Sequence, residues 1–424
     1  MLLKKISLQN YRGIQNLNVE FKPGINLIIG NNGAGKTSLL NGISVVLSAA
    51  TTLLNSMMLQ INANDIHMSY NDTGDATTSI RYHTPVELNA EISYNGKNYI
   101  QGIKRVSESA NSDVDNLDLG IEIKRLSAEP KQMLPLLNYQ NAGRGTVKFK
   151  ESKQISIKQG KVERSAGYKE TFSNVINFDD IENWCFRMDM AEYQGKKEIK
   201  EYKYFKTLVI NFIKQLHVQA KKPRLYYSSA WGSLVYVDNS EETPFYNLSA
   251  GFQSVLCVAM ELAYRASILN PELNTDDVDM DVDGIVLIDE IEMHLHPAWQ
   301  WKILDALKNT FPKVQFIIAT HSPIVLSSAK DASLFLMKNV NEVVSLENAF
   351  GYKIDDVLSL RQGTNDMPEE ISAYYDKIEE LLDSYDERGL NKLQETVREK
   401  YGKDSHISKM INDFIAVNKW IEEE

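Results

Sequence analysis

The sequence predicts an α/β protein with a mixed, mostly parallel sheet and a functional site at the carboxyl ends of its strands. Two observations lead to this fold class. Four apolar runs have the length and composition of buried strands, and each of them ends in polar or glycine-rich residues. Strands that end in this way deliver functional groups to one edge of a parallel sheet. The four runs are 25–29, 133–139, 284–288 and 314–319.

A glycine-rich loop at 30–37 follows the first run and fits G-x-x-x-x-G-K-[ST] at every fixed position. A helical pattern at 38–43 follows it, so strand, loop and helix stand in the order that a phosphate-binding loop requires. Lys36 is expected at the β and γ phosphates of a nucleotide, and the Thr37 hydroxyl at Mg²⁺. The predicted nucleotide-binding residues of this loop are Asn31, Asn32, Gly33, Ala34, Gly35, Lys36, Thr37 and Ser38.

Composition predicts a soluble globular protein. With 424 residues, 43% hydrophobic and 24% charged, the chain can bury one large core with an appended part, or form two domains. Cys185 and Cys257 lie in apolar or aromatic segments and form no disulfide framework, which fits a reducing cytoplasm. No apolar run approaches the ~20 residues that span a bilayer, so we expect a cytoplasmic protein without a membrane partner.

Charge is distributed unevenly along the chain. The formal net charge of -11 argues against a protein that coats nucleic acid over its whole surface. The window 144–164 carries seven Lys or Arg residues and two Glu residues, as expected either for a DNA contact or for a solvated hairpin. Residues 271–283 carry six carboxylates and no base, and 364–424 carry 16 acidic and eight basic residues.

The chain opens with two alternating segments, 3–14 and 17–21, which predict an antiparallel β-ribbon beside the nucleotide site. Pro23 and Gly24 form the turn into the strand before the phosphate loop. Arg12 on this ribbon is expected to lie against the nucleotide, and the alternative is an ordinary surface arginine.

The middle of the chain predicts an insertion of mixed structure. Alternating segments around Asn95-Gly96 are typical of a hairpin. The expected elements are a helix that becomes a polar surface segment over 44–80, hairpin strands at 86–94 and 97–104, a strand at 119–126, and a long helical pattern over 178–218 broken at Gly195.

Three later clusters carry chemistry. Ser249, within 247–253, is a good N-cap for the helical pattern that follows, and taken alone the cluster is equally well a capped helix start. Asp289 and Glu290 end an apolar strand, where a carboxylate can bind Mg²⁺ and a second can activate the attacking water. His321 follows the next apolar strand.

Taken in order, 30–37, Leu248-Ser249-Ala250-Gly251-Phe252-Gln253, Asp289-Glu290 and His321 resemble the phosphate loop, LSxGxQ signature, acidic strand and switch histidine of ABC-type ATPases. The stretches 11–14 and 289–297 resemble the SMC, RecF and OLD-like branch. The resemblance implies a P-loop ABC-type ATPase head at 1–345, with an inserted β-hairpin and helical segment at about 51–245, and a C-terminal helical region at 346–424.

The same resemblance implies roles for individual residues, with ATP and Mg²⁺ as cofactors. Glu290 and His321 would be catalytic, and Thr37 and Asp289 would bind the metal. Ser249, Gly251 and Gln253 would contact a nucleotide held by a second copy of the chain. The Q-loop equivalent stays open among Gln140, Tyr139 and Arg144. Two histidines alone, His294 and His296, form an incomplete zinc set. In the resembled family this stretch lies at the dimer interface near the partner's nucleotide, which is the role that the resemblance implies here.

Residues 134–144, 167–168 and 350–420 resemble more narrowly the ATPase subunits of Septu and retron-associated antiphage systems. This implies a homo-oligomer built from ATP-sandwich dimers, a separate nuclease subunit of HNH type, and DNA or a reverse transcriptase and noncoding RNA complex as further partners. After His321 we expect a strand at 334–338 and then helices. Asp355-Asp356 has no strand context, so no nuclease site is expected within the chain.

Three functions compete. The first is an ATP-switched dimer that regulates an effector nuclease, and the second is a RecF-like DNA-binding repair ATPase. The third, a transporter motor, is disfavoured by the inserted hairpins and by the segment 294–297. The acidic tail is expected either to dock a partner or to form a structural cap. Its apolar stripes comprise Tyr374, Tyr375, Ile378, Leu381, Leu382, Leu390, Leu393, Ile411, Phe414, Ile415 and Trp420.

Overall fold

The computed structural model forms two compact units, Met1–Tyr352 and Lys353–Glu424. It describes all residues except 55–56, 72–78, 143–162, 174–177, 218–219, 273–281, 347–349, 351–368, 404–405 and 422–424. The basic window therefore lies outside the described residues, apart from Glu163 and Arg164. Arg144, Asp355-Asp356 and most of the acidic run at 271–283 lie outside them as well.

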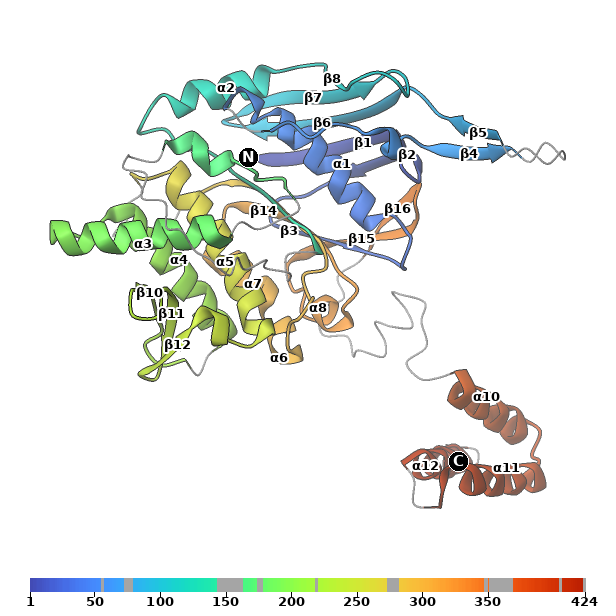
Figure 1. Cartoon of the computed structure of the whole chain (residues 1–424). Helices are drawn as coiled ribbons and strands as arrows, with labels where there is room; N and C mark the ends of the chain where they lie inside the picture. The colour runs from blue at the N-terminus through green and yellow to red at the C-terminus, as the bar shows by residue number, and fades with distance from the viewer. Residues whose placement is uncertain are drawn as a thin grey trace. The chain divides into compact units, whose positions relative to one another are not determined.

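The first unit is built on a six-stranded sheet with the strand order β16-β15-β3-β14-β13-β9 (Figure 1). All neighbouring pairs in it are parallel except β15 with β16, so the predicted mixed, mostly parallel sheet is confirmed. Its strands are β3 (Ile25–Ile29), β9 (Leu136–Gln140), β13 (Gly284–Ile288), β14 (Val314–Ala319), β15 (Ala332–Asn339) and β16 (Glu342–Leu346). Every residue of β3, β9, β13 and β14 is buried, which explains their continuous apolar sequences.

A second, antiparallel sheet has the order β2-β1-β6-β7-β8 and confirms the predicted ribbon and hairpin. Asn95 and Gly96 both have positive φ, as a two-residue hairpin turn requires. Helix α1 (Lys36–Ala49) packs against β1, β6 and β7 of this sheet and against β13 and β14 of the first. The strands are β1 (Leu2–Tyr11), β2 (Ile14–Glu20), β6 (Val86–Tyr94), β7 (Lys97–Arg105) and β8 (Asp113–Val114).

The helical part of the insertion surrounds the long helix α5 (Ala250–Leu269). The predicted break at Gly195 is confirmed, because α3 (Phe178–Gly195) ends there and α4 (Lys200–Leu216) follows. Buried Trp184 packs its ring edge-to-face against Tyr202, Phe205 and Tyr264. A three-stranded sheet, β10 (Arg224–Ser228), β11 (Ser233–Asp238) and β12 (Glu241–Pro244), leads into the 3-10 turn η5 (Phe245–Asn247).

Within the described residues, α5 has the length and composition of a membrane span, with a mean hydropathy of 1.2 in its most apolar window. However, 83% of that window is buried inside the fold, as in the core helix of a globular protein. Cys257 on this helix and Cys185 on α3 are buried free thiols, as predicted from their apolar surroundings.

Two sequence-based expectations were wrong, and a third was incomplete. Segment 119–126 belongs to helix α2 (Asp118–Ser127), whose buried positions Leu119, Ile123 and Leu126 recur at helical spacing. The surface segment expected toward the end of 44–80 also carries an unpredicted two-stranded ribbon, β4 (Met68–Asn71) and β5 (Ser79–Tyr82), which projects from the unit (Figure 1). Strand β15 is followed by β16 instead of a helix.

Short helices connect the remaining parts of the first unit. The described part of the C-terminal unit is a bundle of three helices with its own core. Ile378, Leu390 and Ile411 belong to that core, so most of the predicted apolar stripes pack against one another. The bundle helices are α10 (Glu369–Asp383), α11 (Glu387–Tyr401) and α12 (His406–Ile421). The short helices are η1 (Thr52–Leu54), η2 (Ala63–Asp65), η4 (Arg164–Tyr168), α6 (Pro297–Gln300), α7 (Ile303–Thr310) and α8 (Pro323–Ser327).

Candidate nucleotide-binding site

A cavity of about 430 Å³ lies at the carboxyl ends of β3, β13 and β14. It brings together residues that are far apart in the sequence, because parallel strands end at the same edge of the sheet. Most of its lining was predicted, and Gly13 and Val340 are additions. The lining comprises Gly13, Asn32, Gly33, Gly35, Lys36, Thr37, Ser38, Asp289, Glu290, His321 and Val340.

The loop between β3 and α1 curls tightly around the cavity. Gly35 has a φ of 99° at the N-cap of α1, a conformation that glycine adopts without strain. A Cβ atom at Gly30 would lie 2.5 Å from the Met337 carbonyl oxygen, so this position needs glycine for close packing. Asn31 and Ala34 belong to the same loop between residues that line the cavity.

Lys36 is the one Lys or Arg among the described residues that line the cavity. Its Nζ donates to the carbonyl oxygens of Gly30 at 2.7 Å and Asn31 at 3.0 Å, so the ammonium group is held by its own loop. Burial lowers the pKa of Lys36, and the carboxylates of Asp289 and Glu290 oppose that shift. Partial burial also means that water competes weakly for this charge, which favours a strong contact with an anion.

Thr37 and Asp289 meet on the opposite side of the loop. The Thr37 hydroxyl donates to Asp289 Oδ2 at 2.8 Å, and Asp289 is 2% exposed. Hydroxyl and carboxylate oxygens are the ligands that Mg²⁺ prefers, and a phosphate-bound Mg²⁺ takes only one or two ligands from the protein. The residue types and their proximity therefore fit a Mg²⁺ site.

Glu290 and His321 face the same cavity from the ends of adjacent parallel strands. Burial lowers the pKa of His321, and Lys36 adds to that shift, while Glu292, Glu290 and Asp289 oppose it. His321 is therefore held neutral at ordinary pH and can donate one ring N–H without carrying a charge.

Arg12 lies beside the cavity lining and not in it. Its Nε donates to Asp65 Oδ1 at 2.8 Å, and its neighbour Gly13 lines the cavity. Asp65 also accepts from the Asn62 backbone at 2.9 Å, which fixes the arginine's partner in place. Contact between Arg12 and a nucleotide stays a prediction.

The signature residues are absent from the described lining of this cavity. Ser249 caps α5 by accepting from the Phe252 N–H. A Cβ atom at Gly251 would lie 2.5 Å from the His294 carbonyl oxygen, so the signature loop rests directly on segment 290–296. Gln253 Nε2 donates to the carbonyl oxygens of Phe245, Tyr246 and Leu248, at 3.0, 3.2 and 3.0 Å. Its amide nitrogen thus shapes the loop that presents Ser249.

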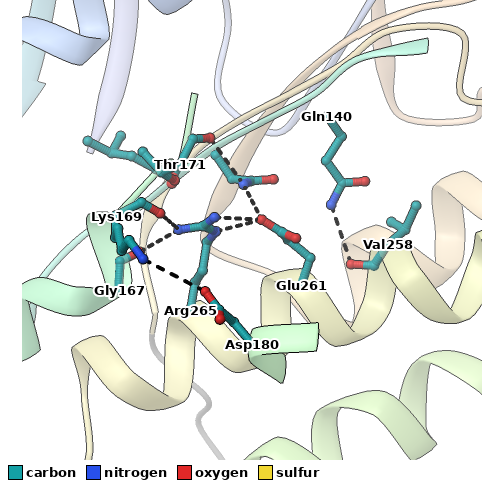
Figure 2. Close-up of polar contacts among 10 residues, drawn as sticks. Gln140, Gly167, Lys169, Thr171, Asp180, Val258, Glu261 and Arg265 are labelled. Carbon is teal, nitrogen blue, oxygen red and sulfur yellow. Dashed lines mark hydrogen bonds and ion pairs between the residues drawn. The ribbon is translucent and has the colours of Figure 1, made fainter. Parts of the chain in front are cut away.

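Gln140, the first Q-loop candidate, points into the protein interior. Its Nε2 lies 3.4 Å from the Val258 carbonyl oxygen on α5, and Figure 2 shows the amide directed at that helix. Tyr139 is buried next to it, and Arg144 lies outside the described residues. The Q-loop role therefore remains open.

The same region holds a buried polar network on α5 (Figure 2). Glu261 and Arg265 form an ion pair, with a 2.8 Å hydrogen bond from Arg265 Nε to Glu261 Oε1. Arg265 also donates to the carbonyl oxygens of Gly167 and Lys169, and Asn138 on β9 contacts Glu261. These contacts join 167–171 and β9 to helix α5. Removing one partner would leave a buried charge unpaired, which is strongly destabilising.

Sequence reasoning missed a set of contacts between the two loops that follow β13 and β14. Glu292 accepts from the Thr320 hydroxyl at 2.7 Å and from the His321 backbone N–H at 2.6 Å. Gln300 accepts from the Ser322 hydroxyl at 2.6 Å. The motif at 289–297 contains Glu292, but its spacing does not reveal which strand end the side chain reaches.

Comparisons with known proteins agree with this geometry. A family model described as "AAA domain" matches residues 5–223, more than half of the chain, and a second AAA domain model matches residues 186–327. The "Retron Vc95 probable ATPase" of Vibrio cholerae is 26% identical over 441 residues, covering 90% of this chain and 83% of the relative. The "Septu protein PtuA" of Bacillus thuringiensis is 23% identical over 414 residues, covering 93% and 92%.

Among solved structures, an SMC head bound to the C-winged helix domain of ScpA aligns with a TM-score of 0.50 at 15% identity, covering 82% of this chain and 98% of that one. At this identity the alignment shows the fold alone. The first unit therefore has the α/β fold of an SMC-type ATPase head.

Proposed function

The chain belongs to the AAA domain family and is an ATPase, and we propose that it works as an ATP-dependent dimeric switch controlling a separate effector nuclease in antiphage defence. The observation that carries this proposal is the cavity in which Lys36, Asp289, Glu290 and His321 meet without the signature residues. The proposal has three parts: hydrolysis within one chain, closure with a second copy, and control of a partner.

For hydrolysis, each lining residue has a distinct task. Lys36 would exchange the carbonyl oxygens of its own loop for the phosphates, and Thr37 and Asp289 would hold Mg²⁺, which supplies charge neutralisation at the phosphates when bound. Glu290 would accept a proton from the water that attacks the γ phosphorus, while the bond from that phosphorus to the β–γ bridging oxygen breaks and ADP leaves. His321 would donate a ring N–H toward the γ phosphate, where negative charge must be stabilised.

Closure with a second copy would complete this site. Ser249 caps helix α5 and Gly251 lies in its first turn, and neither lines the described cavity of its own chain. Ser249 and Ala250 are exposed at the N-terminus of this 20-residue helix. Backbone N–H groups at such a terminus favour anions. We infer that the signature loop from one chain covers the phosphates bound by another, in an oligomer built from such dimers.

Replacing Ser249 with arginine tests this closure. The larger cation would occupy the space where a γ phosphate must approach the loop, so ATP-dependent dimerisation should be lost while ATP binding to one chain stays within about threefold, because Ser249 lies outside the cavity. Light scattering with and without ATP measures the first quantity, and equilibrium titration measures the second. Unchanged dimerisation in the Ser249→Arg variant would show that the site is not shared between chains.

Control of a partner is assigned to the C-terminal unit. Its apolar stripes are mostly used in its own core, but a groove of about 470 Å³ between α10 and α11 remains. The relatives that match over most of the chain carry retron and Septu names, which supports a defence role over DNA repair. We therefore place the nuclease contact on this unit, with the protein acting in the cytoplasm.

Removing the C-terminal unit tests this assignment. A chain ending at Phe350 should keep its fold, because each unit is compact by itself. It should no longer co-purify with the proposed nuclease partner, for which the product of the adjacent gene is used in the test. We expect the affinity of the truncated chain for the nuclease to be lower by at least about tenfold. Retention of the nuclease by a folded, truncated chain would contradict docking and leave the bundle as a structural cap. DNA cleavage by the full-length chain alone would also contradict the proposal.

A further inference from the structure

Glu292 connects the loop that carries Glu290 to the loop that carries His321. Its Oε1 accepts from the His321 backbone N–H at 2.6 Å, and its Oε2 accepts from the Thr320 hydroxyl at 2.7 Å. Both carboxylate oxygens are therefore engaged by residues 28 and 29 positions later in the chain. Hydrogen bonds to a charged acceptor are short and directional, so they define one arrangement of the two loops.

The Thr320 hydroxyl is oriented for this contact. Thr320 is fully buried, and its Oγ1 accepts from the Ser322 backbone N–H at 3.1 Å, which leaves the hydroxyl proton directed at Glu292. The Thr320 backbone N–H continues the sheet by donating to the Ile28 carbonyl oxygen at 3.2 Å. Immediately after this last sheet contact, the Glu292 carboxylate holds the backbone of His321.

The segment that presents Glu292 is a tight turn. The Met293 N–H donates to the Glu290 carbonyl oxygen at 3.0 Å, and the Leu295 N–H donates to the Glu292 carbonyl oxygen at 2.9 Å, so backbone hydrogen bonds hold the turn. Glu290 adopts a left-handed backbone conformation, with a φ of 49°. Because Glu290 begins this turn and Glu292 within it holds His321, the turn links the position of His321 to that of Glu290 at the cavity.

We propose that Glu292 is a positioning residue for ATP hydrolysis: by holding the His321 backbone, it sets the separation of His321 and Glu290 across the cavity. This inference rests on the role of His321 in the proposed function. Glu292 holds the His321 backbone and Thr320 through two hydrogen bonds to neutral groups, so the reach of its side chain should matter more for this role than the charge by which it opposes the lowering of the His321 pKa.

Two conservative variants of the full-length chain separate reach from charge. Glu292→Gln keeps the length of the side chain, and its carbonyl oxygen can still accept from the His321 N–H while the Thr320 oxygen accepts from its amide. Glu292→Asp keeps the charge but is one methylene shorter, so the carboxylate cannot reach both donors. Glu292→Ala removes both properties. ATP turnover and ATP affinity are measured for each variant, with thermal unfolding as a check of folding.

Positioning predicts that Glu292→Asp and Glu292→Ala lower kcat by about tenfold to a hundredfold with KM and ATP affinity within about threefold, since misplacement affects the reacting geometry more than binding. Glu292→Gln should stay within about threefold of the parent. If Glu292→Gln is as slow as Glu292→Ala while Glu292→Asp is active, the charge matters and the proposal is wrong. The Gln and Asp variants carry the test if Glu292→Ala fails to fold.

A double-mutant cycle separates this inference from the function on which it rests. His321→Ala alone should be slow, and adding Glu292→Ala should lower kcat no further, because Glu292 acts through His321. Losses that multiply would show that Glu292 acts independently, which overturns the inference and leaves the role of His321 intact. Parent-like turnover by His321→Ala would instead overturn the role proposed for His321 and the positioning role with it, while Glu290→Gln still reports on the catalytic base.

Discussion

A Lys36→Ala variant is expected to lose ATP binding by at least about a hundredfold, or about 3 kcal/mol, because charge-assisted hydrogen bonds contribute about 1.5–3 kcal/mol each. Lys36 is the one Lys or Arg that lines the cavity within the described residues, and no neighbouring lysine or arginine in that lining can replace its ammonium group. Equilibrium titration with a fluorescent ATP analogue measures the loss directly.

The control is Lys338→Ala. Lys338 lies on β15 in the same unit and pairs with Glu342 at 3.0 Å, but it does not line the cavity. Removing it changes the net charge by the same amount and should leave ATP affinity within about twofold, since exposed ion pairs contribute little. Thermal unfolding without nucleotide checks the fold, because Lys36→Ala also leaves the Gly30 and Asn31 carbonyl oxygens without this donor. Parent-like ATP binding by a folded Lys36→Ala variant would mean that the cavity is not the nucleotide site.

Much of the central fold could be predicted because its strands are buried on both faces. A strand in that environment is continuously apolar, so 25–29, 284–288 and 314–319 match β3, β13 and β14 to the residue. The hairpin around Asn95 and Gly96 was equally clear, since positive φ at both positions restricts the residue types.

The errors have a common physical origin: short segments with a few apolar residues fit both strand and helix. In 119–126 the side chains of Leu119, Ile123 and Leu126 recur at helical spacing, but alternating neighbours obscured the period. Strand β16 is only partly buried, so it lacks the continuous apolar run that marked β13 and β14. Its pairing with β15 depends on a turn in which Asn341 accepts from the Gln15 backbone at 2.7 Å, a contact between distant segments.

In the candidate site, too, some features could be predicted from the sequence and others could not. Motif spacing identified Lys36, Asp289 and His321, because each lies at the end of a strand or in a loop of fixed length. Spacing could not show that Glu292 reaches His321, since that contact depends on how two loops fold toward each other after the sheet ends. Nor could it show that the Gln253 amide nitrogen is used within its own loop, because the carbonyl oxygens that it contacts belong to the preceding turn.

A Glu290→Gln variant is expected to bind ATP like the parent and to lose hydrolysis, with kcat lower by about a hundredfold to ten-thousandfold, the range typical for removal of a general base. Glutamine matches glutamate in length and removes the group that accepts the proton. Because Glu290 follows Asp289 directly, the Thr37–Asp289 contact at 2.8 Å should be preserved, and with it the predicted Mg²⁺ ligands. Steady-state phosphate release measures kcat, and the titration used for Lys36→Ala measures binding.

The two variants must differ if the assignments are correct, since one removes a phosphate contact and the other a proton acceptor. Glu342→Gln is the matched control for Glu290→Gln: it makes the same chemical change on a side chain that pairs with Lys338 at 3.0 Å and does not line the cavity. If both glutamine variants hydrolyse ATP like the parent, the catalytic base lies elsewhere. If only Glu290→Gln is slow, it should also hold ATP and accumulate the closed dimer, because a ligand that favours one arrangement and is not consumed shifts the population toward it.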